Sequence, residues 1–483
     1  MAGMLTFISC LYTRRRGATL CAGIALAVVV MAGCQPPPVQ TFSATVAPTP
    51  LAEAPIYSPT PTFTATFTLT PTPTGTPTPT PTLTPTLTPS PTPTVPLLTL
   101  TPARPDGAPA AYQHLPADLA ADTGWSCDDF PCADDIDGFL RRIRVPIGYT
   151  LSHVGRFPGQ PLQIVYGPDG RLYATVIENG ATRTGAVYAL DENGSAMRYS
   201  GDFVSPVGLA FQPGTDILYV SARVTASSGG GLWRVLPGGG APQPVLTDLP
   251  CCYSLIDNQP NGMTFGPDGY LYLGIGALTD HAEPPNPQIA SMTDLHPFEA
   301  AVLRIQPHTG EVSVYAAGLR NPFDLAFAPD GQLYATDQGL VSGIGDRLLQ
   351  IEAGAHYGWP YWRDRGCADC PLRPGSIIVS PDLLAFPSYT IPRGLVAYTG
   401  NQFPANLFGS LFVVLWNGVE GGQRIVRVDP RSVPQPDEDQ PFPPAEPFVT
   451  GLIRPIDVTV APDGALVVAD YIYGHVWRVR YRQ

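Results

Sequence analysis

The stretch Tyr166-Gly-Pro-Asp-Gly-Arg-Leu-Tyr173 decides the fold, because variants of it return along the chain. Proline presets φ, aspartate caps locally and glycine accepts positive φ, so Pro-Asp-Gly between apolar runs predicts a tight turn between two β-strands. Close or looser copies occupy residues 211–219, 265–272, 327–334, 407–412 and 460–467. Each copy is followed by a second strand-like run, as at 187–190. Six such units predict an all-β fold, a six-bladed β-propeller. We expect residues 149–154 to pair with the last unit and close the ring.

The N-terminus has the pattern of an export signal. Arg14 to Arg16 form a basic patch, and an apolar run over 18–30 ends in Met-Ala-Gly before Cys34. This run is shorter than the roughly 20 residues that cross a bilayer, so it predicts a signal peptide over residues 1–33. Small residues followed by a cysteine resemble a bacterial lipobox. We therefore expect an extracytoplasmic lipoprotein attached to the cell membrane through Cys34; an uncleaved signal anchor is the alternative.

The next segment has the composition of a stalk. Residues 34–104 repeat Thr-Pro, and proline removes backbone donors and favours extended angles. Such a segment cannot pack a core and tends to polyproline II, so we expect a disordered linker. The remaining chain divides into an N-terminal extension over 105–145 and the propeller domain over 146–483.

Charge argues against one class of partner. The formal net charge is −13 and the sequence contains no lysine. Since nucleic-acid binding depends on basic surfaces, we do not expect a nucleic-acid partner.

The cysteines fit an exported protein, where disulfides persist. Sequence proximity suggests one bridge between Cys127 and Cys132 and another between Cys367 and Cys370. The neighbours Cys251 and Cys252 remain, and adjacent Cα atoms lie about 3.8 Å apart across a trans peptide, which is short for a bridge. A zinc site is the competing interpretation of the Cys-x-x-Cys that begins at position 367.

The repeats also locate a candidate site. The loop that leads into each innermost strand of a propeller opens onto the central channel, and here each such loop carries a proline. The polar residues of these loops are Gln160, Asn258, Gln259, Arg320, Asn321, Asp324, Arg393, Arg454 and Asp457. The guanidinium groups of the three arginines suit carboxylate or phosphate groups. In the alternative, they pair with Asp324 and Asp457 and only close the channel.

The segment from Pro146 to Arg480 resembles the soluble quinoprotein glucose/sorbosone dehydrogenases, six-bladed propellers that use pyrroloquinoline quinone (PQQ) and calcium. The matching motifs, in family order, are Gly318-Leu-Arg-Asn-Pro-Phe-Asp324, Asp337-Gln-Gly339, Gly345-Asp346 and His356-Tyr-Gly-Trp-Pro360. The resemblance implies that Arg320 and Asn321 touch the quinone. It further suggests Arg393, Arg454 and Tyr357 as cofactor-binding residues. It also implies that the backbone carbonyls of Gly339 and Leu340 face calcium, with Asp346 nearby.

The sequence departs from the family at the catalytic base. The position of the family's catalytic histidine holds Asn258, which cannot accept a proton near neutral pH. Its neighbour Asp257 is the candidate replacement. The cofactor-anchoring lysine of the family is absent, since the chain has none.

Two functions therefore stay open at the level of sequence. The first is a PQQ-dependent dehydrogenase that oxidises a small-molecule sugar at C1 with a calcium-activated quinone and passes electrons to an acceptor that the sequence does not identify. The second is a non-catalytic propeller that binds a saccharide or another extracytoplasmic ligand.

Overall fold

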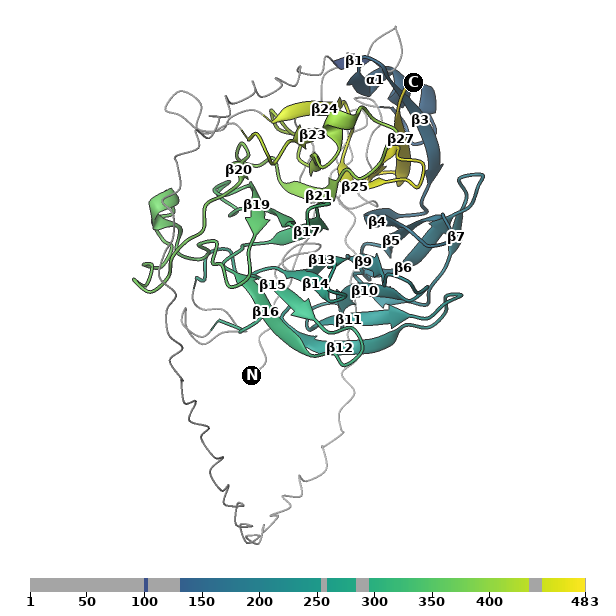
Figure 1. Ribbon diagram of the computed structural model, residues 1–483. Helices are drawn as coiled ribbons and strands as arrows, with labels where there is room; N and C mark the ends of the chain where they lie inside the picture. Colours follow the sequence, from purple (N-terminus) through teal and green to yellow (C-terminus); the bar gives the residue numbers. More distant parts are fainter. Residues whose placement is uncertain (1–99, 103–130, 253–258, 284–294, 434–444, 483) are drawn as a thin grey trace, which may run out of the picture. The chain divides into compact units, whose positions relative to one another are not determined.

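The computed structural model describes residues 100–102, 131–252, 259–283, 295–433 and 445–482 (Figure 1). Within these residues the regular secondary structure is almost entirely β-strand, with one helix, α1 (Ile136–Arg142), and two short 3-10 helices, η1 (Trp362–Arg365) and η2 (Ala405–Leu407). No helix in this part combines the length and the apolar character that a membrane crossing requires. The predicted signal peptide, Cys34, Cys127, Asp257 and Asn258 lie outside the described residues.

Twenty-four of the 27 described strands form six antiparallel units of four, which follow one another around the fold (Figure 1). The first contains β4 (Gln160–Tyr166), β5 (Leu172–Asn179), β6 (Thr184–Leu190) and β7 (Ala196–Arg198). The second contains β9 (Leu209–Phe211), β10 (Leu218–Arg223), β11 (Gly230–Val235) and β12 (Gln243–Leu249). The third contains β13 (Pro260–Phe265), β14 (Leu271–Ile275), β15 (Ala301–Ile305) and β16 (Val312–Ala317).

The other three units repeat this plan. The fourth contains β17 (Pro322–Phe327), β18 (Leu333–Asp337), β19 (Arg347–Ile351) and β20 (Leu384–Ala385). The fifth contains β21 (Pro392–Ala397), β22 (Leu411–Leu415), β23 (Arg424–Val428) and β24 (Glu446–Thr450). The sixth contains β25 (Pro455–Val460), β26 (Leu466–Asp470), β27 (His475–Tyr481) and β3 (Tyr149–Arg156).

The units are arranged in a ring. Each innermost strand contacts the next in the order β4, β9, β13, β17, β21 and β25, and β25 contacts β4 again. β8 (Phe203–Val204) pairs with both β6 and β10 and joins the first two units into one sheet. β3 pairs with β27, in the register Leu151 to Val479, which is the ring closure that the sequence predicted. The fold is therefore a β-propeller.

The N-terminal side of the propeller differs from the predicted boundaries. β1 (Leu100–Pro102) falls inside the predicted stalk, but it pairs with β2 (Arg144–Pro146), which in turn pairs with β24. An open sheet edge offers unpaired backbone donors and acceptors, so even a Thr-Pro segment can add a short strand there.

The Pro-Asp-Gly turns have the geometry expected of them. In the first, the N–H of Gly170 donates to the carbonyl of Gly167 at 3.0 Å, and Gly170 has a φ of +78°. The carboxylate of Asp169 accepts from the N–H of Arg171 at 3.1 Å. Each turn thus joins an innermost strand to the second strand at the end opposite the leading loop.

One position of the innermost strands explains how the ring packs. It holds a polar residue in three units and glycine in the other three: Gln163, Gly208, Gly262, Asp324, Gly394 and Asp457. A Cβ on Gly394 would lie 2.2 Å from Oδ1 of Asp457, and one on Gly262 would lie 2.7 Å from Oδ1 of Asp324. The glycines therefore make room for side chains that project onto the axis from neighbouring units.

The core lies between the sheets. β14 and β22 are buried at every position, because each middle strand packs against the sheets of both neighbouring units. Unbroken apolar runs of this kind are the sequence signature of strands covered on both faces.

Candidate functional site

The three predicted arginines lie at the same end of three consecutive innermost strands. Arg320 lies two residues before β17, Arg393 is the second residue of β21 and Arg454 directly precedes β25. All three side chains are buried. The guanidinium of Arg393 lies 4.3 Å from the ring centroid of Phe323 and 5.5 Å from that of Trp416. Arg454 lies 5.5 Å from the same Trp416 ring. The indole of Trp416 is therefore shared by two guanidinium groups. We call Arg320, Arg393 and Arg454 together the cationic mouth.

Trp416 and its neighbour Asn417 were not predicted as site residues. Nη1 of Arg454 donates to Oδ1 of Asn417 at 2.9 Å and to the carbonyl of Trp416 at 3.3 Å. Both residues follow β22, the second strand of the fifth unit. Their position in the sequence would have indicated them, because the second strand of each unit runs back toward the mouth and the residues after it lie there.

A buried aspartate sets the backbone of the Arg-Asn-Pro motif. Asp337, at the end of β18, accepts from the N–H of Arg320 at 3.0 Å and from that of Asn321 at 2.7 Å. Its other oxygen accepts from Nη2 of Arg347 at 2.8 Å, and both side chains of this ion pair are fully buried. The ion pair thus fixes the backbone conformation at Arg320 and Asn321, and with it the direction of their side chains.

Asn321 is held by side chains of two units. Its Oδ1 accepts from Nδ2 of Asn261 at 2.8 Å, and its Nδ2 donates to Oε1 of Gln338 at 3.2 Å. Gln259, another predicted mouth residue, donates through Nε2 to the carbonyl of Ser205 at 3.3 Å. Contacts of this kind link neighbouring units around the mouth.

Arg320 has a carboxylate partner within the protein. Nη2 of Arg320 lies 2.9 Å from Oδ1 of Asp280, and their side chains are 2% and 13% exposed. Asp280 belongs to the segment that follows β14. The same Oδ1 accepts from the N–H of Val341 at 2.9 Å, so one oxygen joins Arg320 to the loop that was predicted to face calcium.

The predicted metal residues lie in that loop. Asp346 accepts from the N–H of Gly339 and from that of Ile391, both at 2.9 Å, and burial raises the pKa of Asp346 to about 6. The carbonyl of Leu340 accepts from the N–H of Gly343 at 2.8 Å. The described residues contain no group of three or more His, Cys, Asp or Glu side chains that could hold a metal ion. A calcium ion at this loop would therefore need backbone carbonyls, as the resemblance implies.

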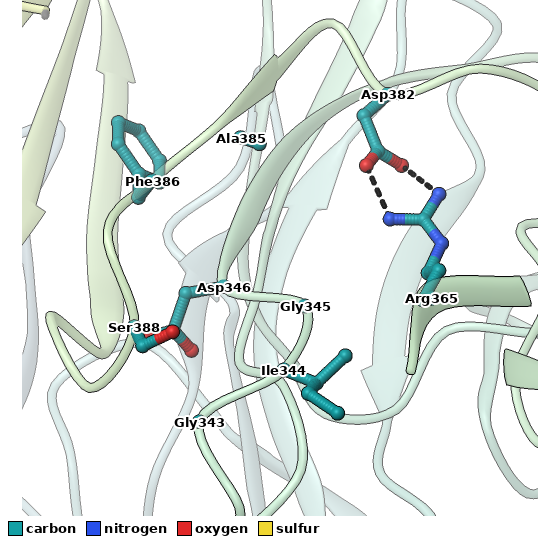
Figure 2. Close-up of a pocket in the computed structure, with 9 residues that line it drawn as sticks. All are labelled: Gly343, Ile344, Gly345, Asp346, Arg365, Asp382, Ala385, Phe386 and Ser388. Carbon is teal, nitrogen blue, oxygen red and sulfur yellow. Dashed lines mark hydrogen bonds and ion pairs between the residues drawn. The ribbon is translucent and has the colours of Figure 1, made fainter. Parts of the chain in front are cut away.

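A pocket of about 190 Å³ adjoins this loop (Figure 2). Its lining residues are Gly343, Ile344, Gly345, Asp346, Arg365, Asp382, Ala385, Phe386 and Ser388. Figure 2 shows Arg365 and Asp382 facing each other, with Nη1–Oδ2 and Nη2–Oδ1 distances of 2.6 and 3.0 Å. Asp382 also accepts from Nη1 of Arg347 at 2.9 Å. The pocket is thus connected through Arg347 to the backbone of the cationic mouth.

Polar side chains fill the axis of the ring. Oδ1 of Asp324 accepts from Nε2 of Gln163 at 2.5 Å, and Oδ2 of Asp457 accepts from the N–H of Ile164 at 2.6 Å. Burial raises the pKa of Asp324 to about 7, and burial together with Asp324 raises that of Asp457 well above its ordinary value. Asp324 thus disfavours the charged form of the Asp457 carboxyl.

Tyr357 was predicted to bind the cofactor, and the structure places its side chain elsewhere. Its hydroxyl donates to the carbonyl of Gln350 at 2.5 Å and accepts from the N–H of Glu352 at 3.0 Å. The ring is buried in the apolar cluster between the third and fourth units. The motif around Tyr357 therefore builds the wall of the fourth unit.

The described cysteines are paired. Cys367 and Cys370 form a disulfide with a Cα–Cα distance of 5.4 Å, in place of the alternative zinc site. Cys251 and Cys252 form a vicinal disulfide. Cys132 is disulfide-bonded, while Cys127, its predicted partner, lies outside the described residues.

Part of this chain is similar in sequence to known proteins. Residues 257–476 match the Glucose / Sorbosone dehydrogenase family. Quinoprotein glucose dehydrogenase B of Acinetobacter calcoaceticus is 33% identical over 141 residues, 25% of this chain and 28% of that protein. An uncharacterized protein of Borreliella burgdorferi is 25% identical over 207 residues, 38% of this chain and 53% of that protein. The chain thus spans about half the length of one of these relatives and little more than a quarter of the other.

Solved structures support the fold. The soluble aldose sugar dehydrogenase of Escherichia coli matches with a TM-score of 0.51 at 15% identity, covering 69% of this chain and all of that one. The PQQ domain of the pyranose dehydrogenase from Coprinopsis cinerea matches with a TM-score of 0.50 at 16% identity, covering 70% and 97%. The predicted resemblance is therefore confirmed: residues 257–476 of this chain match the model of the glucose/sorbosone dehydrogenase family.

Proposed function

We propose that this protein is an extracytoplasmic, lipid-anchored sugar dehydrogenase that uses PQQ and calcium to oxidise an aldose at C1. The observation that carries the proposal is the cationic mouth. Arg320, Arg393 and Arg454 come from three consecutive units, and Asp280 joins Arg320 to Val341, next to Gly339 and Leu340. Three guanidinium groups beside a carbonyl-rich loop suit a tricarboxylate cofactor with a bound cation.

The residues present fit such a cofactor. Arg320 already accommodates one carboxylate, that of Asp280, so carboxylate chemistry is compatible with this part of the mouth. Arg393 and Arg454, with Trp416 between them, offer charge and an aromatic face on the neighbouring side. When bound, the quinone would supply the two-electron acceptor and calcium would polarise its carbonyl.

The proton acceptor is assigned to Asp257, the residue before Asn258. A carboxylate accepts a proton, whereas a carboxamide does not near neutral pH. The second candidate function, a non-catalytic saccharide-binding propeller, is favoured by two observations. Asn258 occupies the position of the family's histidine, and Asp280 already neutralises Arg320.

Reconstitution tests the proposal. The full chain is titrated with PQQ in the presence of calcium, followed by absorbance, and then offered aldoses with a reducible dye. Arg320→Ala should weaken PQQ binding ten- to a hundredfold, because a charge-assisted hydrogen bond is worth roughly 1.5–3 kcal/mol. Arg320→Lys should restore only part, since an ammonium lacks the planar two-point contact.

A surface arginine provides the matched control. Arg304 of β15 is 32% exposed and pairs with Asp268 of the turn between β13 and β14, at the end of the unit opposite the mouth. Arg304→Ala should therefore bind PQQ like the wild type. Absence of PQQ binding by the wild type would reject the dehydrogenase. Binding without dye reduction by any aldose, in a protein that the cofactor saturates, would favour the non-catalytic alternative.

A further inference from the structure

One carboxylate oxygen of Asp280 accepts hydrogen bonds from two separate parts of the site. Oδ1 of Asp280 lies 2.9 Å from both Nη2 of Arg320 and the N–H of Val341. This single oxygen therefore occupies the point where a cation of the mouth and a donor of the 339–345 loop converge. A carboxylate oxygen is the group that satisfies two such donors at once.

The backbone places Asp280 firmly at this point. Nε1 of Trp359 donates to the carbonyl of Asp280 at 2.8 Å, and the N–H of Asp280 donates to Oε1 of Glu283 at 3.2 Å. The N–H of Ala277, three residues earlier, donates to the carbonyl of Arg320 at 2.8 Å. The segment that follows β14 is thus tied to Arg320 through its backbone as well as through the carboxylate.

Burial decides what happens when a ligand arrives. Arg320 is 2% exposed, and a buried cation without an anionic partner is strongly destabilising, so Asp280 is its counter-ion in the ligand-free protein. A ligand carboxylate beside Arg320 would bring a second negative charge next to Asp280. At this depth two carboxylates repel each other, and Arg320 balances only one of them.

We propose that Asp280 is a specificity-determining residue, an internal carboxylate that a carboxylate-bearing ligand must displace from Arg320. The inference deepens the proposed function and, for the quinone as ligand, rests on it. The ligand that exchanges with Asp280 must present an oxygen to Arg320 and to the N–H of Val341 together. A neutral or cationic ligand gains nothing from this exchange, so the mouth selects for an anionic, carboxylate-bearing group.

Chemical rescue tests the exchange without reference to the quinone. Asp280→Ala removes the internal carboxylate from the full chain, and Asp280→Asn keeps its size while removing its charge. Thermal unfolding is measured in sodium acetate and in sodium chloride at equal ionic strength. We expect both variants to melt below the wild type in chloride. Acetate should restore most of the lost Tm of Asp280→Ala and leave the wild type unchanged.

A matched control separates this effect from a change in net charge. Asp202 pairs with Arg198 on the surface, with a side chain that is 76% exposed. Asp202→Ala carries the same charge change and should respond equally to acetate and chloride. If acetate stabilises Asp280→Ala no more than chloride does, the exchange is overturned. If Asp280→Ala does not fold, the same comparison is made with Asp280→Ser, whose shorter side chain also leaves room for acetate.

Titration with PQQ then relates the exchange to the proposed function. Asp280→Asn should bind PQQ about tenfold more tightly or better, the scale expected on removing one like charge near an anion. Measurable binding that is unchanged or weaker in Asp280→Asn overturns the proposal. Acetate rescue without any PQQ binding leaves the exchange standing and removes the dehydrogenase. PQQ binding without acetate rescue overturns the exchange and leaves the dehydrogenase proposal standing.

Discussion

The buried ion pair between Asp337 and Arg347 gives the sharpest prediction about how the site is held. Oδ2 of Asp337 lies 3.0 Å from Nε and 2.8 Å from Nη2 of Arg347, and both side chains are fully buried. Asp337→Asn would leave Arg347 with Asp382 as its described carboxylate partner. Breaking a buried pair by removing one charge costs about 3–5 kcal/mol. Because Asp382 remains, we expect the free energy of unfolding to fall by about 3 kcal/mol, measured by urea denaturation.

The chain contains a matched pair on its surface. Oδ2 of Asp268 lies 3.0 Å from Nε and 2.8 Å from Nη2 of Arg304, the same two distances, but these side chains are 35% and 32% exposed. An exposed pair contributes about 0–1 kcal/mol, so Asp268→Asn should change the free energy of unfolding by no more than that. Asp337→Asn should also weaken ligand binding, since Asp337 holds the N–H groups of Arg320 and Asn321. Equal losses of stability in the two variants would refute the argument from burial.

Three further predictions concern the axis, the closing strand and the N-terminus. Gly394→Ala places a Cβ 2.4 Å from Cα of Asp457, a backbone atom that cannot move aside as a side chain could. This variant should lower the free energy of unfolding by about 3 kcal/mol or more. Gly375 has open space around it, so Gly375→Ala should change the free energy of unfolding by no more than about 0.5 kcal/mol. Burial and the neighbouring His153 lower the pKa of His475 from 6.5 to about 4, so its contribution to stability is present above pH 6.5 and is lost as the pH falls toward 4. Comparing wild type with His475→Gln by thermal melts at pH 7 and 4.5 should show a smaller acid loss in the variant, and an equal loss would contradict the assignment. Mass spectrometry of membrane-fraction protein should find an acylated Cys34 as the first residue, and Cys34→Ala should abolish membrane attachment; an unmodified N-terminus elsewhere would exclude the anchor.

Local signals predicted the fold because the interactions behind them are local. The turn at Gly170 is closed by a hydrogen bond to Gly167 and by the carboxylate of Asp169, all within a few residues of each other. Repetition of that turn then gave the number of units. The mouth arginines were predicted from the same logic, because the loop that leads into one innermost strand has an equivalent in the next repeat.

The partners of the site residues could not be predicted in this way. Asp280 reaches Arg320 across 40 residues and Val341 across 61, and nothing in its own sequence neighbourhood marks it as a counter-ion. Tyr357 shows the opposite situation. It stands in a family motif, but its hydroxyl is used by the backbone of the fourth unit. A motif fixes which residues occur together, whereas only the packed ring decides which way each side chain points.

The polar side chains that fill the axis limit how a ligand can enter and leave the molecule. Gln163 of the first unit reaches Asp324 of the fourth, so polar groups meet where a tube would need open space. Any molecule held among the arginines must then leave through the opening by which it arrived. In the proposed dehydrogenase, a reduced donor and an oxidised acceptor that both need that opening would have to take turns. Steady-state rates measured against both reactants should therefore give parallel double-reciprocal lines, the pattern of a ping-pong sequence.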